Sequence, residues 1–200
     1  MPERVQKGQG TMRAFTFENA TKIYFGGGCV KEHLLEAVKP YGETVMLAYG
    51  GGSIKTNGIY QEVMDVLKLA GKQVIEFSGI MPNPTYSKVM EGKKVVQENQ
   101  VDLILAVGGG SVMDCSKAIS MAAATDKDVW EEYWIKKGEI DFEPVPVGVI
   151  VTVVGTGSEV NGEGVITHEE QKIKTSRNYP RCNPVFAMMD PKYTYTVSPL

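Results

Sequence analysis

Apolar and polar positions follow a repeating pattern along most of the chain. Short apolar runs rich in β-branched residues predict strands at 44–49, 73–77, 102–107, 147–153 and 185–189. Apolar residues at helical spacing predict helices at 31–40, 59–70, 85–99 and 110–124. Strands that alternate with helices are typical of a parallel sheet with right-handed crossovers. The pattern therefore predicts an α/β fold with a doubly wound, mostly parallel, Rossmann-like sheet.

Three segments do not follow this repeat. Residues 1–13 are polar, and we predict a disordered leader there, followed by one α/β domain over 14–200. Residues 15–25 alternate in the manner of an edge strand or a hairpin. Residues 127–145 contain both tryptophans and are expected to form an excursion on the surface.

Composition narrows the class of protein. The 200 residues are 42% hydrophobic and 22% charged, with a formal net charge of -3, which lacks the basic excess of a general nucleic-acid binder. No apolar run approaches the ~20 residues that span a bilayer. The three cysteines form no CxxC pair and fit reduced thiols: Cys29, Cys115 and Cys182. We therefore expect a cytoplasmic protein without nucleic-acid or membrane partners.

Histidine is scarce. The chain has two, His33 and His168, and neither belongs to a metal-ligand pattern such as HExxH. We interpret both as solvated polar side chains and expect no self-contained metal site or histidine-based triad in this chain.

Two similar glycine-rich segments form the first candidate site. VMLAYGGGSI (45–54) and LILAVGGGSV (103–112) each place three glycines and a serine at the carboxyl end of a predicted parallel strand, where open α/β sheets bind ligands. Glycine exposes backbone N–H groups to an anion, and a following helix adds a favourable dipole. Plain turn chemistry stays an alternative, and Ser111 with Asp114 also matches a capping box. Neither GxGxxG nor GxxxxGK[ST] is present.

Two further stretches carry polar groups. In 151–167, an apolar run breaks into a loop whose side chains could hydrogen-bond a polar ligand: Thr152, Thr156, Ser158 and Asn161. A hairpin with a Gly/Ser/Asn turn explains the same residues equally well. Four basic residues cluster further on, and we interpret them mainly as a solvated face: Lys172, Lys174, Arg177 and Arg181.

Five motifs in order resemble the iron-containing alcohol dehydrogenases: YGGGSIKTNG (49–58), GIMPNPTY (79–86), GGGSVMDCSK (108–117), VVGTGSEVNGEGVIT (153–167) and MMDPKYTYTVSP (188–199). The resemblance covers about residues 14–200 and is greatest to the NADP-dependent butanol dehydrogenase and aldehyde reductase branch. It implies an N-terminal dinucleotide-binding domain and a C-terminal all-helical domain that holds a divalent metal, iron or zinc, through Asp and His. Those ligands have no match in this chain. We therefore expect the cofactor-binding half, truncated near the domain boundary and inactive alone.

The resemblance also assigns positions. It places the pyrophosphate on Gly108, Gly109, Gly110 and Ser111, with Asp114 near the nicotinamide end. It matches adenine, ribose or other cofactor-adjacent contacts to Thr152, Thr156, Asn161, Lys174 and Thr196. Glu163 departs from the smaller residue expected there, which leaves the course of its loop open. No catalytic residue is assigned within this chain.

The loop after the strand at 44–49 bears on the choice of cofactor. NAD-selective sites place a carboxylate against the ribose 2′-OH. The loop here offers open N–H groups, a hydroxyl and a lysine, with no acid expected in reach: Gly50, Gly51, Gly52, Ser53 and Lys55. Such groups suit a 2′-phosphate. We therefore predict NADP(H) rather than NADH.

The resemblance implies hydride transfer between NADPH and a primary alcohol or aldehyde such as butanol or butanal, with the metal polarising the substrate oxygen. An exposed apolar surface and self-association, for example as a homodimer, would follow if a helical domain normally packs there. The alternatives are an NAD-linked polyol or glycerol-phosphate dehydrogenase of the same fold group, a nucleotide-binding regulatory module, and an interaction protein without a ligand.

Overall fold

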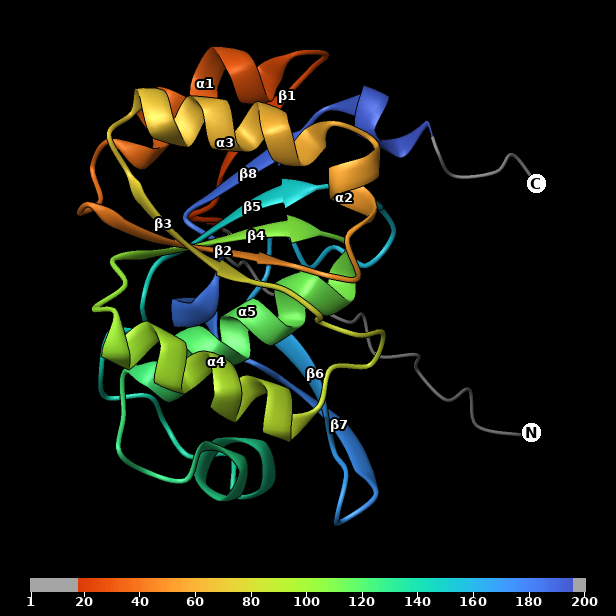
Figure 1. Cartoon of the computed structure of the whole chain (residues 1–200). Coiled ribbons are helices and arrows are strands. Elements are labelled where there is room, and N and C mark those ends of the chain that lie inside the picture. The colour runs from red at the N-terminus through yellow and green to blue at the C-terminus, as the bar shows by residue number, and fades with distance from the viewer. Residues whose placement is uncertain (1–17, 196–200) are drawn as a thin grey trace, which may run out of the picture.

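The computed structural model describes residues 18–195 and confirms the α/β sheet. All strand pairs in the main sheet are parallel, in the order β1-β8-β5-β4-β2-β3 (Figure 1). The strands are β1 (Lys22–Phe25), β2 (Thr44–Tyr49), β3 (Gln73–Phe77), β4 (Leu103–Gly108), β5 (Val147–Val151) and β8 (Phe186–Met189). The fully buried, apolar sequence of β4 suits its place inside the sheet.

Helices cover both faces of the sheet, as the doubly wound prediction requires. On one face lie α1 (Cys29–Val38), α3 (Ile59–Leu69) and the short α2 (Ser53–Thr56). On the other lie α4 (Tyr86–Glu98) and α5 (Gly110–Ala123), as Figure 1 shows. Each face has its own hydrophobic core, built from alternate residues of the same strands.

The sequence of α3 illustrates why these helices form where they do. Its buried side chains, Ile59, Val63, Val66 and Leu67, recur at the spacing of one helix face. The helix ends at Leu69, and Gly71 follows the C-cap residue with a φ of 70°, in the left-handed region. The N–H of Lys72 donates to the carbonyl of Leu67, which closes the terminal turn.

A separate antiparallel hairpin lies beside α5. It consists of β6 (Glu163–His168) and β7 (Ile173–Asn178). Strand β5 ends at Val151 and stays in the main sheet, so the alternative of a hairpin spanning 151–167 is wrong. Residues 152–162 instead connect the main sheet to this hairpin.

The segment 127–145 lies on the surface only in its second part, since most of 135–143 is exposed but 129–134 is largely buried. A π-helical stretch, Trp130–Ile135, buries both tryptophans. The indole N–H of Trp134 donates to the carbonyl of Gly164 at 3.1 Å, and that of Trp130 donates to the amide oxygen of Gln171 at 2.8 Å. The prediction of a surface excursion was wrong for 129–134 because the hairpin supplies both apolar contacts and hydrogen-bond acceptors for these side chains.

Both histidines pack on aromatic rings rather than standing free in solvent. His33 stacks on Tyr24 at 4.9 Å between ring centroids and keeps 40% of its side chain exposed. His168 is half-buried and stacks on Tyr86 at 5.1 Å, with Trp130 at 5.0 Å. The interpretation as a solvated side chain is therefore wrong for His168.

At the start of the described range, β1 pairs in parallel with β8 at the edge of the main sheet, in keeping with the edge-strand prediction, whereas the first residues of the alternative hairpin over 15–25 lie outside the described range. The predicted leader at 1–13, the residues around Phe15 and the candidate Thr196 lie outside the described residues. Among the helices of residues 18–195, none is long and apolar enough to cross a bilayer.

Candidate functional site

The two glycine loops lie next to each other at the carboxyl edge of the sheet. Strands β2 and β4 are neighbours, with Tyr49 paired to Val107, so Gly50 and Gly108 leave the sheet side by side. A Cβ atom on Gly50 would lie 3.2 Å from the carbonyl oxygen of Ile80 and 3.9 Å from Val112. The predicted position of each loop at the carboxyl end of a parallel strand is confirmed, and the structure also places the two loops next to each other.

The first loop borders an open cavity of about 280 Å³. Its lining consists of Tyr49, Gly50, Gly51, Gly52, Lys55, Ser78 and Gly79. Gly52 adopts a φ of 105°, which side chains rarely tolerate, whereas a Cβ on Gly51 would meet no atom within 4 Å. The backbone of this loop is therefore accessible to a ligand.

The second loop is overlaid by the segment that follows β5. The N–H of Thr152 donates to the carbonyl of Gly108 at 3.0 Å. A Cβ on Gly110 would lie only 2.7 Å from Thr156 Cγ2, so glycine is what permits this approach. The structure thus brings Thr152 and Thr156, both candidate cofactor contacts, against the second glycine loop.

The predicted capping box of Ser111 and Asp114 does not form. Helix α5 begins at Gly110, which places Ser111 inside its first turn, and no side chain caps it. The carboxylate of Asp114 instead accepts from the hydroxyl of Ser158 at 2.5 Å and from the N–H of Val165 at 3.1 Å. It ties α5 to the overlying loop and to β6.

A buried lysine that the sequence analysis did not single out completes this connection. Lys117 is 2% exposed, and its ammonium donates to the carbonyl and hydroxyl oxygens of Ser158, at 3.0 and 2.8 Å. It also reaches the carbonyl and side-chain oxygens of Asn161, at 3.0 and 3.3 Å. The Nζ atom lies 3.7 Å from a carboxylate oxygen of Asp114. We call Asp114, Lys117, Ser158 and Asn161 the buried cluster.

Burial governs the ionisation of this cluster. It lowers the pKa of Lys117 to about 8, even though nearby Asp114 favours the charged amine. It also raises the pKa of Asp114, in spite of Ser158 and Lys117, which favour the carboxylate. For both partners, loss of water outweighs their attraction. Asn161, predicted as a cofactor contact, uses two oxygens here to hold Lys117.

A second charged cluster lies beside the 280 Å³ cavity, and it corrects the expectation that no acid is in reach. Glu76, on β3, accepts from Lys55 at 3.1 Å. It also accepts from the hydroxyls of Tyr49 at 2.5 Å and Tyr60 at 2.7 Å. Glu76 was missed because it lies on the neighbouring strand rather than in the glycine loop. We call Tyr49, Lys55, Tyr60 and Glu76 the rim cluster.

The basic residues near the hairpin separate into different environments. Lys174, on β7, is exposed and donates to Asn83 at 2.5 Å, in the motif at 79–86. Lys172 and Arg181 are exposed, in keeping with a solvated face. Arg177 is half-buried and donates to the carbonyl of Ser176 at 2.6 Å, so it does not fit that description.

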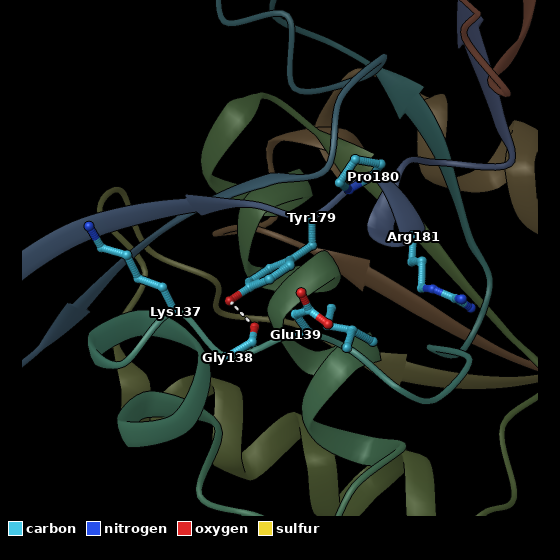
Figure 2. Close-up of a pocket in the computed structure, with 7 residues that line it drawn as sticks. Lys137, Gly138, Glu139, Tyr179, Pro180 and Arg181 are labelled. Carbon is cyan, nitrogen blue, oxygen red and sulfur yellow. Dashed lines mark hydrogen bonds between the residues drawn. The ribbon is translucent and has the colours of Figure 1, made fainter.

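Another cavity, of about 380 Å³, is lined by Lys137, Gly138, Glu139, Ile140, Tyr179, Pro180 and Arg181. Figure 2 shows Tyr179 reaching toward the backbone of Gly138, to which its hydroxyl donates at 3.0 Å. None of the predicted site residues lines this cavity, so it is not the candidate site.

The described residues do not fit the metal that the resemblance implies. Across 18–195, no group of three or more His, Cys, Asp or Glu side chains is placed to hold an ion. The three cysteines are free and buried, and burial raises the pKa of Cys115 and of Cys182 to about 12.

Comparison with known proteins decides the family. The sequence model of the iron-containing alcohol dehydrogenase family matches residues 20–191. This chain is a member of that family.

The relatives of this chain carry names that state different cofactors, NADH in some and NADPH in others. The probable NADH-dependent butanol dehydrogenase 1 of Bacillus subtilis is 45% identical over 186 residues, which cover 93% of this chain and 47% of that protein. The NADPH-dependent aldehyde reductase YqhD of Escherichia coli is 39% identical over 189 residues, covering 94% and 48%. The crystal structure of NADH-dependent butanol dehydrogenase A from Thermotoga maritima superposes with a TM-score of 0.87 at 39% identity, covering 94% of this chain and 46% of that one. The chain spans about half the length of the relatives it matches.

Proposed function

We propose that this chain binds NADP(H) and forms the cofactor half of a metal-dependent alcohol dehydrogenase or aldehyde reductase. The observation that carries the proposal is the meeting of both glycine loops and the 152–161 segment at one edge of the sheet. This edge is where parallel α/β sheets bind nucleotides. Family membership supports the same assignment.

We assign the pyrophosphate to Gly108, Gly109, Gly110 and Ser111. Helix α5 is 14 residues long and starts at Gly110, so its dipole favours an anion there. Contacts to the rest of the cofactor are proposed for Thr152, Thr156, Asn161, Asp114, Lys174 and Thr196. Thr152 and Thr156 have the strongest support, because they lie against the second glycine loop.

We assign the adenosine 2′-phosphate to the 280 Å³ cavity. The backbone of Gly50, Gly51 and Gly52 borders this cavity, together with the Lys55 side chain, and Ser53 follows in sequence. These groups support NADPH as the preferred cofactor. NADH is the second candidate, favoured by the names of several relatives and by the carboxylate of Glu76 beside Lys55.

A primary alcohol or aldehyde is the proposed substrate class, since relatives are named butanol dehydrogenase and aldehyde reductase. A bound reduced nicotinamide supplies a hydride to the carbonyl carbon. The part played by the described residues is to hold the cofactor. Because they do not fit a metal site, we propose that the chain alone has no turnover. Reduction of butanal by the purified chain, followed by NADPH absorbance, should stay at the background rate.

A fluorescence titration of the chain with NADPH and with NADH tests the cofactor proposal. Gly51→Asp adds a carboxylate to the cavity at a position with open space and should weaken NADPH binding at least tenfold, by repulsion of the 2′-phosphate. Gln73→Glu, at the exposed amino end of β3, adds the same charge and should leave binding unchanged. Binding of neither nucleotide by the unmodified chain would contradict the proposal.

Two broader expectations remain proposals. The buried, free cysteines support a cytoplasmic location. Exposed apolar side chains at Phe25, Val153 and Val154 support association through this part of the surface, for example as a homodimer. Sedimentation of the chain would give its oligomeric state.

A further inference from the structure

The rim cluster joins the proposed 2′-phosphate cavity to a carboxylate on the neighbouring strand. Lys55 lines the cavity, whereas Glu76 does not belong to its lining. The Lys55 ammonium lies 3.1 Å from Glu76, 4.5 Å from the centre of the Tyr60 ring and 5.3 Å from that of Tyr49. Two aromatic rings and one carboxylate thus hold the cation at the edge of the cavity.

Both oxygens of Glu76 are already in use. Oε1 accepts from the Tyr60 hydroxyl, and Oε2 accepts from the Tyr49 hydroxyl and from Lys55. Hydrogen bonds from Tyr49, Tyr60 and Lys55 lower the pKa of Glu76 to about 2. The carboxylate therefore stays charged at neutral pH, and the contacts of Lys55 with Tyr49 and Glu76 raise the pKa of that lysine.

An acid can influence cofactor choice in two ways. A carboxylate that selects NADH does so directly, by accepting from the ribose 2′-OH. Glu76 is not among the residues that line the cavity, and both of its oxygens already accept hydrogen bonds from the rim cluster, so Lys55 is the charged side chain in the lining. The Oε2 oxygen of Glu76, in contrast, lies 3.1 Å from the Lys55 ammonium, the cation that a 2′-phosphate would meet.

We infer that Glu76 is a specificity-determining positioning residue, which holds Lys55 at the cavity and offsets its charge so that the preference for NADPH over NADH stays small. This inference rests on the proposed cofactor function. The neutral pair attracts a 2′-phosphate less than a free lysine would, and it leaves the cavity usable by a 2′-OH. The mixture of NADH and NADPH in the names of relatives is consistent with a preference that small changes can shift.

Glu76→Gln tests the inference in the chain as it stands. Glutamine keeps a side-chain oxygen to accept from a tyrosine but removes the negative charge. We expect the Kd for NADPH to fall roughly fivefold to tenfold, because the positive charge of Lys55 is no longer offset. The Kd for NADH should change less than twofold, since NADH carries no 2′-phosphate.

Two further variants make the test specific. Glu36→Gln removes one negative charge from an exposed pair with Lys39 on α1, at 3.5 Å, and should leave both Kd values unchanged. In the double variant Lys55→Gln with Glu76→Gln, the gain in NADPH affinity should disappear, because Glu76 acts through Lys55. Thermal unfolding of each variant identifies any general loss of structure.

Three outcomes would overturn the inference while leaving the cofactor proposal intact. The first is an unchanged ratio of the two Kd values in Glu76→Gln. The second is weaker NADH binding with unchanged NADPH binding, which would mean that Glu76 accepts directly from the ribose. The third is a gain that persists in the double variant. Failure of the unmodified chain to bind either nucleotide would instead contradict the proposed function, and the inference with it.

Discussion

The buried cluster and the rim cluster each pair a lysine with a carboxylate, yet they respond oppositely to their surroundings. At the rim, Lys55 and Glu76 are 47% and 42% exposed, and each favours the charged form of the other. In the buried cluster, the side chains of Lys117 and Asp114 are 1% and 13% exposed, and burial disfavours both charges. A lysine and a carboxylate thus stabilise each other's charge at the exposed rim. In the interior, the same pair of residue types holds α5 to the overlying loop and to β6.

Removal of the buried cation should have the largest effect on stability. Lys117→Met leaves Asp114 buried without its cation and deprives Ser158 and Asn161 of their donor. We expect the free energy of unfolding to fall by about 3 kcal/mol. Chemical denaturation at pH 7 measures this change.

The matched control is Lys94→Met, which removes an exposed lysine from α4. Its effect should stay within about 0.5 kcal/mol. Equal losses in the two variants would show that the buried cluster contributes nothing beyond an ordinary surface lysine.

The second largest effect should be the pH dependence that Lys117 gives to the free energy of unfolding. The pKa of this lysine is about 8 in the folded chain and 10.5 when unfolded, so the unfolded chain binds more protons between these values. Stability from this group therefore rises with pH over that window. The difference between the unmodified chain and Lys117→Met should grow by about 2 kcal/mol from pH 8 to pH 10. A constant or shrinking difference in denaturation series would contradict the depressed pKa.

The rim carboxylate should matter much less for stability. Glu76→Gln is expected to lower the free energy of unfolding by less than about 1 kcal/mol at pH 7, since water screens an exposed pair. The pKa of Glu76 is lowered from 4.5 to about 2, so this contribution is present above pH 4.5 and is lost as pH falls toward 2. Thermal melts across this range give the comparison, and a loss as large as that of Lys117→Met would contradict it.

Salt should have the smallest effect and should act only at the rim. We expect the ratio of the Kd for NADH to the Kd for NADPH to fall by about threefold when the salt concentration is raised from 50 to 500 mM. The reason is that the Debye length shortens and salt screens the attraction between Lys55 and the 2′-phosphate. The stability difference between the unmodified chain and Lys117→Met should change little, since the side chains of Lys117 and Asp114 are only 1% and 13% exposed and buried pairs are weakly screened. An insensitive Kd ratio would argue against a charged 2′-phosphate in the cavity.

Much of the fold followed from the apolar pattern alone. The runs at 44–49 and 102–107 are continuous because both faces of a central parallel strand are buried, and their strands lie where predicted. The prediction for 127–145 failed because it depends on contacts that are distant in the sequence. Trp130 and Trp134 are buried by a hairpin 30 or more residues later, and local sequence gives no indication of that contact.

The site was predictable where it depends on strand ends and was missed where it depends on packing between elements. Glycine loops at Gly50 and Gly108 follow directly from the positions of their strands. The roles of Lys117 and Glu76 became visible only in three dimensions. Ser158 is in a loop about 40 residues away from Lys117, and the partners of Glu76 come from β2, α2 and α3. For Glu76, the signal was its place near the end of a strand, where the sheet brings it beside the first glycine loop.

The pairing of β1 with β8 has a consequence for how the chain is made. Residues 22–25 emerge from the ribosome early, but their partner strand comes at 186–189. Until then β5, which pairs with β8, presents an open edge, and such edges recruit strands of other molecules. Synthesis at about 5–20 residues per second leaves this edge unprotected for roughly 2 to 8 seconds after β5 is complete. Chaperone binding to nascent chains should therefore peak in this interval and decline once β8 closes the sheet.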